Sequence, residues 1–118
     1  MGTFSHPITF ISASNGATQT LEALVDTGAT FTTIPSPILE RLGVQVQRSV
    51  QLQLANGQVV EWALGEVVAE ILGMRSTIIC IFGPTDAPPL IGAHTLEAFL
   101  LTVDPIEQRL LPKRGFLG

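Results

Sequence analysis

Hydrophobic and polar residues alternate with a period of two along several stretches of this chain, a pattern typical of β-strands with one buried face. The clearest stretch covers residues 50–64, where the alternation is interrupted only around Asn56-Gly57. Asn-Gly accepts the positive φ angles of a type I′ turn at little steric cost. This stretch therefore predicts a β-hairpin whose turn is of that type.

Similar strand patterns continue along the rest of the chain, separated by residues that favour turns. Further strands are predicted at residues 7–13, 19–25, 31–34, 67–72, 76–82, 90–92, 100–103 and 109–111. Turns are expected at residues 14–16, around Gly73-Met74 and at Asp104-Pro105, whereas the proline-rich residues 83–89 favour a loop. Residues 112–118 are expected to be loose or to lie as a strap over a partner.

Two short helices interrupt the strands. Ser36 suits the N-cap of the first, Pro37 suits its first helical position, and Gly43 is placed to end it. A second short helix is predicted at residues 94–99. Because strands dominate and no linker divides residues 1–118, the sequence predicts one all-β domain with one or two short helices.

Composition narrows the possible functions. The 118 residues are 46% hydrophobic and 14% charged with a net charge of −4, so the chain is globular and lacks the basic surface of a nucleic-acid binder. No stretch is apolar enough to cross a membrane and no secretion signal is visible, so a cytoplasmic protein without membrane contact is expected. The single cysteine, Cys80, excludes an internal disulfide and a cysteine-rich metal site. His94 and Glu97 are interpreted as a surface pair and not as metal ligands.

The position of Asp26 in the sequence suggests a chemical role. The predicted strand of residues 19–25 leads directly into Asp26-Thr27-Gly28. A lone carboxylate is costly to place at the end of a buried strand, which suggests a functional group. The tripeptide alone is also compatible with an aspartate that only hydrogen-bonds its own turn.

The surrounding motifs resemble those of retropepsin-like aspartic proteases. Residues 24–30 (LVDTGAT) are similar to the active-site motif of that family. Residues 89–92 (PLIG), followed by the helix at 94–99, are similar to its second signature, and the hairpin at Asn56-Gly57 lies where the family carries its flap. Residues 102–111 are more similar to the ending of the DNA-damage-inducible ubiquitin-shuttle proteases and of stand-alone prokaryotic relatives. The flap tip departs from the glycine-rich tip of the viral enzymes.

This resemblance implies a fold, an assembly and a chemistry. The fold is a closed, barrel-like all-β lobe paired as a C2 homodimer, and the activity is that of an endopeptidase needing no metal and no cofactor. Peptide or unfolded protein is the implied substrate. Asp26 is implied as catalytic, with Thr27 bracing the partner subunit's loop and Gly28 steadying the carboxylate. Substrate contacts are expected from Ala29, Ile34, Ala55, Asn56, Gly57 and Ile91, and Val60, Trp62 and Leu90 are expected to line or support the pockets.

A single Asp-Thr-Gly explains why two chains are needed. Two carboxyls roughly 3 Å apart share one proton, so that one can act as a base and the other as an acid. Asp86 and Asp104 lie in a loop and a turn, and 118 residues leave no room for a second lobe. The second carboxylate is therefore expected from a two-fold-related copy, and the apolar residues of 100–103 and 109–111 are expected to seal that dimer.

Two other interpretations of the sequence stay open. A dimeric peptide-binding or scaffold domain could keep the same fold without cleaving peptides. A monomeric β module could use Asp26 only as a turn residue.

Overall fold

Strands form most of the computed structural model, which describes residues 4–118. They are β1 (Phe4–Ile11), β2 (Thr18–Val25), β3 (Thr32–Pro35), β4 (Val46–Gln53), β5 (Val59–Ile71), β6 (Met74–Gly83), β7 (Leu90–Ile91), β8 (Leu101–Asp104) and β9 (Arg109–Pro112). The helices are α1 (Ser36–Arg41) and α2 (Ala93–Ala98). Neither helix in this part of the chain is long and apolar enough to cross a membrane.

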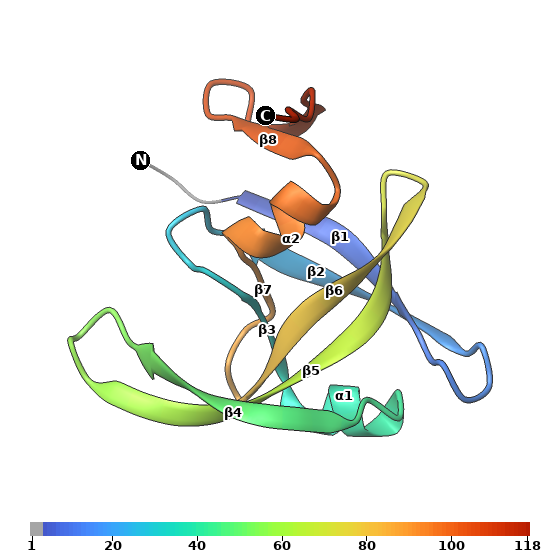
Figure 1. Cartoon of the computed structure of the whole chain (residues 1–118), viewed down its shortest axis with the longest axis vertical. Coiled ribbons are helices and arrows are strands. Elements are labelled where there is room, and N and C mark those ends of the chain that lie inside the picture. Colours follow the sequence, from blue (N-terminus) through green and yellow to red (C-terminus); the bar gives the residue numbers. More distant parts are fainter. Residues whose placement is uncertain (1–3) are drawn as a thin grey trace.

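The main sheet closes on itself (Figure 1). Its neighbouring strands are β1, β2, β7, β3, β6 and β5 in that order, and β5 pairs back with β1. Strand β4 pairs with the outer part of β5, and β8 and β9 form a separate antiparallel pair. The predicted barrel-like, mostly β fold with two short helices is confirmed.

The core fills the interior of this ring. Alternate residues of each strand point inward, so that apolar side chains from distant parts of the sequence meet. The fully buried apolar side chains of this core include Ile8, Phe10, Ala23, Ile34, Leu39, Ala69, Cys80 and Ile91. Removing these side chains from water is the main favourable contribution to the stability of the fold.

Strand β5 runs through two hairpins, whereas the sequence pattern suggested two separate strands there. It pairs with β4 over its first half and with β6 over its second half. Gly65 lies at the change of partner, and a Cβ added to it would lie 2.5 Å from the carbonyl oxygen of Gln45. Because Gly65 has no side chain, the backbone at Gln45 can lie close to it. Strand β5 therefore continues through this position.

The type I′ geometry occurs in the β5–β6 hairpin and not in the β4–β5 hairpin, for which the sequence predicted it. At the β5–β6 connection Leu72 and Gly73 both have positive φ, 51° and 77°, which is the type I′ geometry. At the β4–β5 connection only Gly57 has positive φ (87°), and its amide donates to the carbonyl of Leu54 (2.9 Å). The type I′ prediction for Asn56-Gly57 is therefore wrong, because the loop is longer and places glycine after the turn.

The cap of α1 also differs from the prediction. Pro35 occupies the N-cap, and Ser36 is the first helical residue. The Ser36 hydroxyl donates to the carbonyl of Gly83 (2.8 Å), which ties the helix to the end of β6. Gly43 ends the helix as expected, with φ of 73° and its amide donating to Glu40 (3.0 Å).

Candidate active site

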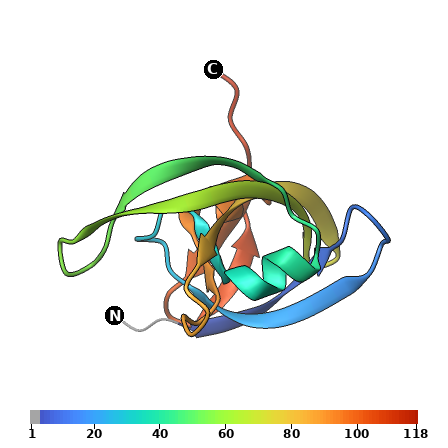
Figure 2. The same cartoon turned by 90° about the horizontal axis from the view of Figure 1, so that it is seen from below.

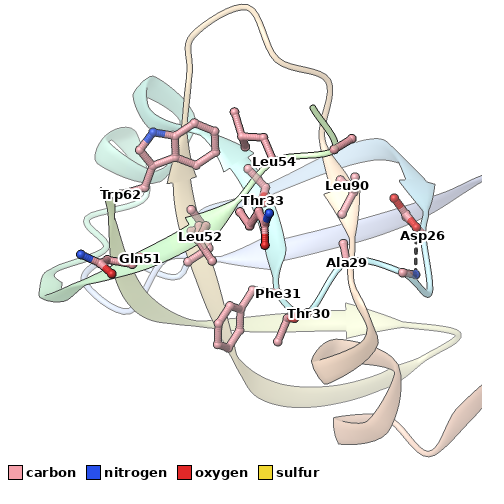
Figure 3. A pocket seen from close by; sticks show the side chains of 14 residues that line it. Asp26, Ala29, Thr30, Phe31, Thr33, Gln51, Leu52, Leu54, Trp62 and Leu90 are labelled. Carbon is pink, nitrogen blue, oxygen red and sulfur yellow. Dashed lines mark hydrogen bonds between the residues drawn. The ribbon is translucent and has the colours of Figure 1, made fainter. Parts of the chain in front are cut away.

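Asp26 follows the last residue of β2, where that strand runs parallel to β7. The Asp26 amide donates to the carbonyl of Ile91 (2.9 Å), which extends the ladder formed by Val25 and Ile91. Its side chain is partly exposed, and Oδ1 accepts the amide of Gly28 at 2.9 Å (Figure 3). The backbone of Asp26 is thus held by Ile91, and its carboxylate is oriented by one hydrogen bond from the Gly28 amide.

The loop after Asp26, residues 26–31, is fastened to the start of α2. The amide of Ala93 donates to the carbonyl of Ala29 (2.7 Å), and the amide of His94 donates to Thr30 (2.9 Å). Gly92 makes this contact possible, since a Cβ on it would lie 2.5 Å from the Phe31 carbonyl group. These contacts make the two sequence signatures neighbours in space.

A buried hydroxyl pair supports the same contact from inside. The Thr32 and Thr95 hydroxyls lie 2.6 Å apart and both residues are fully buried. The Thr32 hydroxyl also accepts the amide of Gly92 (3.2 Å). Because a buried polar group without a partner is costly, this network fixes β3 against α2. The sequence pattern gave no signal for it.

A groove of about 680 Å³ lies between this loop and the β4–β5 hairpin. Its lining residues are Asp26, Gly28, Ala29, Thr30, Phe31, Thr33, Gln51, Leu52, Gln53, Leu54, Ala55, Trp62, Ile81 and Leu90. Asp26 is the only ionisable side chain in this set, and Leu52, Leu54 and Trp62 line the hairpin side (Figure 3). The groove therefore combines one carboxylate with walls made of apolar and uncharged polar side chains.

The expected site residues fall into three groups. Asp26, Gly28, Ala29 and Ala55 line the groove. Asn56 and Gly57 lie exposed at the hairpin tip, where the Asn56 side chain accepts the amide of Gln58 (2.9 Å). Thr27 is exposed outside the groove and lines a separate hollow with residues of α2 and β8.

Ile34 and Ile91 belong to the core, which corrects the expectation that they contact substrate. Both are fully buried inside the ring. Their sequence neighbours Thr33 and Leu90 line the groove in their place. Successive strand residues point to opposite faces, so an error of one position moves a side chain from the groove into the core.

Several groove residues were not predicted, although the alternation carried a signal for them. Phe31, just before β3, and Thr33 are two positions apart and line the groove together, as do Leu52 of β4 and Leu54 just after it. The Phe31 ring also packs 5.8 Å, centre to centre, from the ring of His94. Alternation within residues 31–34 places Phe31 and Thr33 on the face opposite to the buried Thr32 and Ile34.

Two groups with clearly shifted pKa values lie outside the groove. Burial raises the pKa of the Cys80 thiol to about 12, so this side chain acts as a small apolar core residue. Backbone hydrogen bonds from Glu107 and Ile106 lower the pKa of Asp104, and Arg109 lowers it further. Within residues 4–118, no group of three or more His, Cys, Asp or Glu side chains is arranged to hold a metal ion.

Comparison with known proteins identifies the family. The family model described as aspartyl protease matches residues 11–77, which is more than half of the chain and includes Asp26 and the β4–β5 hairpin. The chain belongs to this family and is a retropepsin-like aspartic protease by family and fold. A search of curated proteins found no significant match.

A solved structure shows the same fold. The solution structure of Simian Foamy Virus (mac) protease superposes with a TM-score of 0.56 at 16% identity, covering 79% of this chain and 91% of the viral one. At this level of identity the likeness concerns the fold.

Proposed function

We propose that this chain is one subunit of a homodimeric aspartic endopeptidase. The observation that carries the proposal is the position of Asp26, which is the only ionisable side chain among the residues that line the groove. It also lies in the segment that matches the aspartyl protease family. A single carboxylate cannot act as acid and base at once, so the site needs Asp26 of the partner subunit.

The two carboxyls would share one proton and hold one water between them. The ionised carboxylate takes a proton from the water, whose oxygen attacks the carbonyl carbon of the peptide bond. The protonated carboxyl gives its proton to the carbonyl oxygen. When the tetrahedral intermediate collapses, the C–N bond breaks and the amine leaves with a proton from the dyad. The amide of Gly28 steadies the ionised form by donating to Asp26.

The substrate would be a peptide or an unfolded protein lying extended in the groove. The β4–β5 hairpin supplies strand backbone for pairing with that peptide, and its residues 55–57 would act as a flap. Leu52, Leu54 and Trp62 offer apolar contacts to alternate substrate side chains. Closure of the flap would exclude water from the reacting bond.

Thr27 is assigned to the contact between subunits. Its side chain is exposed on the α2 and β8 side of the Asp26 loop and not in the groove. By resemblance to the family it would hydrogen-bond the partner subunit's loop and brace the two carboxyls. This position supports a two-fold arrangement in which the Asp26 loops face each other.

The test is cleavage of an unfolded protein at mildly acidic pH. Asp26→Asn should lower the cleavage rate about 10³-fold or more, because the dyad loses its shared proton, while the fold and the dimer are kept. Asp86→Asn is the matched control, since Asp86 is exposed in the 83–89 loop, and it should cleave like the wild type.

The outcomes separate the alternatives. Full activity of Asp26→Asn would refute the proposed chemistry. A wild-type dimer that stays inert across pH and substrates would instead support the scaffold interpretation. A protein that sediments only as a monomer would support the simple β module.

A further inference from the structure

His94, the second residue of α2, lies beside the groove but is not one of its lining residues. Its side chain is exposed, and its ring centre lies 5.8 Å from that of Phe31, with the two ring planes tilted by 43°. Aromatic rings attract each other at this separation, because the edge of one ring is electropositive and the face of the other is electronegative. A residue outside the groove is therefore in favourable contact with a residue that lines it.

The backbone of Phe31 is held by the start of the same helix. The amide of His94 donates to the carbonyl of Thr30 (2.9 Å), and Gly92 lets the helix start approach the Phe31 carbonyl group closely. Thr32, the next residue, is fixed by its buried hydroxyl pair. Because the backbone is fixed on both sides of Phe31, the freedom that remains to Phe31 is rotation of its side chain. The ring of His94 restricts that rotation.

The contact with Phe31 also replaces the pairing that the sequence suggested for His94. Glu97 lies three residues further along α2, where a surface pair with His94 was expected. Its carboxylate pairs instead with the Lys113 ammonium. The contact recorded for the His94 ring is the one with Phe31. The role of His94 is therefore to be sought at the groove.

Two aromatic side chains line the groove from different segments, Phe31 from the Asp26 loop and Trp62 from β5. Figure 2 shows the β4–β5 hairpin (green) and the Asp26 loop (cyan) extending from the same side of the ring. Phe31 is half-buried, so a part of its ring is open to a ligand (Figure 3). An uncharged aromatic ring offers a flat side chain an offset or edge-to-face contact, which an aliphatic side chain makes less well.

We infer that His94 is a positioning residue of the groove, which holds the Phe31 ring in the orientation that receives an aromatic side chain of a bound peptide. This inference rests on the part of the proposed function that places a peptide in the groove. His94 touches neither the peptide nor Asp26 and acts through Phe31. It therefore determines which peptides bind and not how the peptide bond is broken.

The experiment measures peptide binding in the Asp26→Asn protein, so that a bound peptide is not cleaved. Trp62 is the single tryptophan of the chain and lines the groove, so its fluorescence reports binding. The probes are short acetylated peptides of alanine and glutamine, either without phenylalanine or with one phenylalanine at successive positions. The phenylalanine peptide that binds most tightly to the Asp26→Asn parent is used for the variants.

His94→Ala should raise the Kd of the phenylalanine peptide about fivefold, the size expected for one aromatic contact. It should leave the Kd of the phenylalanine-free peptide within about twofold. His94→Phe keeps a ring at this position and should bind the phenylalanine peptide as tightly as the parent. In a protein that already carries Phe31→Leu, His94→Ala should change Kd by less than about twofold, since the two residues act as a coupled pair.

His6→Ala is the matched control. His6 is the second of the two histidines, lies on β1 and is not one of the groove's lining residues. Its removal should change the Kd of neither peptide by more than about twofold. A loss specific to His94→Ala then follows from the position of that ring and not from the loss of a histidine.

A phenylalanine-peptide Kd that stays within about twofold of the parent in His94→Ala would overturn the inference. An equal loss for both peptides, or a full effect of His94→Ala in the Phe31→Leu protein, would also refute it, because His94 would then not act through Phe31. A parent that binds none of the peptides would overturn it as well, whereas cleavage of unfolded protein by the wild type would leave the proposed function standing. The expected binding pattern together with an inert wild type would keep the inference and refute the proposed catalysis.

Discussion

The Asp26 loop (residues 26–31) and the tip of the β4–β5 hairpin (residues 54–58) border the same groove but are held in opposite ways. The loop is tied to distant segments, through the Asp26 amide to Ile91 and through Ala29 and Thr30 to the start of α2. The hydrogen bonds recorded for the hairpin tip stay within the tip itself, from Leu54 to Gln58, Gly57 to Leu54 and Gln58 to Asn56.

This difference agrees with what each region has to do in the proposed enzyme. A catalytic carboxylate needs a position fixed within tenths of an ångström, which demands support from the core. A segment that covers a substrate must open and close, and such segments come from the least stable parts of a fold. The core supports the loop, whereas only local turn chemistry supports the tip.

The largest expected effect comes from Gly92→Ala. Gly92 has an extended backbone (φ −96°), which alanine can adopt, so the cost arises from the 2.5 Å contact with the Phe31 carbonyl group. We expect a loss of about 3 kcal/mol in the free energy of unfolding, since the backbone of the Asp26 loop has to shift. Urea unfolding at fixed protein concentration measures it. A loss below about 1 kcal/mol would show that the backbone of the Asp26 loop can shift at little cost. The loop would then not be held more firmly than the hairpin tip.

Thr32→Val tests the buried support of the loop with nearly unchanged shape. The Thr95 hydroxyl and the Gly92 amide would lose their partner in a water-free place, at a cost of about 2 kcal/mol in unfolding free energy. The matched control is Thr9→Val, because Thr9 bonds Thr20 at the surface (2.8 Å) and should change stability by less than about 0.5 kcal/mol. Equal effects in the two variants would remove the special role of the buried pair.

The smallest effect is expected for Gly57→Ala at the hairpin tip. A Cβ there has no atom within 4 Å, so the cost is only that of placing alanine at φ of 87°, about 1 kcal/mol. The change should be confined to the tip and can be followed by amide hydrogen exchange of residues 54–58. Faster exchange of the tip together with unchanged exchange of the Asp26 loop would sharpen the contrast. A change in amide exchange rates throughout the chain would instead indicate that the tip is coupled to the core.

Much of the fold could be predicted, because strand alternation and turn residues act locally. The existence of β4, β5 and β6, the end of α1 at Gly43 and the strand before Asp26 all follow from residues within a few positions. The prediction failed where long-range packing decided between local options. Ser36 is not a cap because it bonds Gly83, and β5 continues through Gly65 because Gln45 approaches there.

The sequence predicted the place of the acidic residue but only part of the groove walls. Asp26 stands at the groove as the motif suggested, whereas Ile34 and Ile91 turned out to be core residues. The face of a strand that is inward depends on its neighbours in the sheet, which a short strand such as β7 does not encode in its own two residues. Phe31 became a groove residue for the same reason, whereas Leu90 lines the groove as expected.

By itself, the sequence determined which segments are extended, where the chain turns and which residue carries the acidic group, since these depend on side-chain type and on backbone preferences over a few residues. Only the tertiary structure decided that β2 and β3 pair with β7, and that the Asp26 loop rests on α2. Such pairings join residues about 60 positions apart, as Thr32 and Thr95 do, and the free energy that selects them comes from burying the whole ring at once.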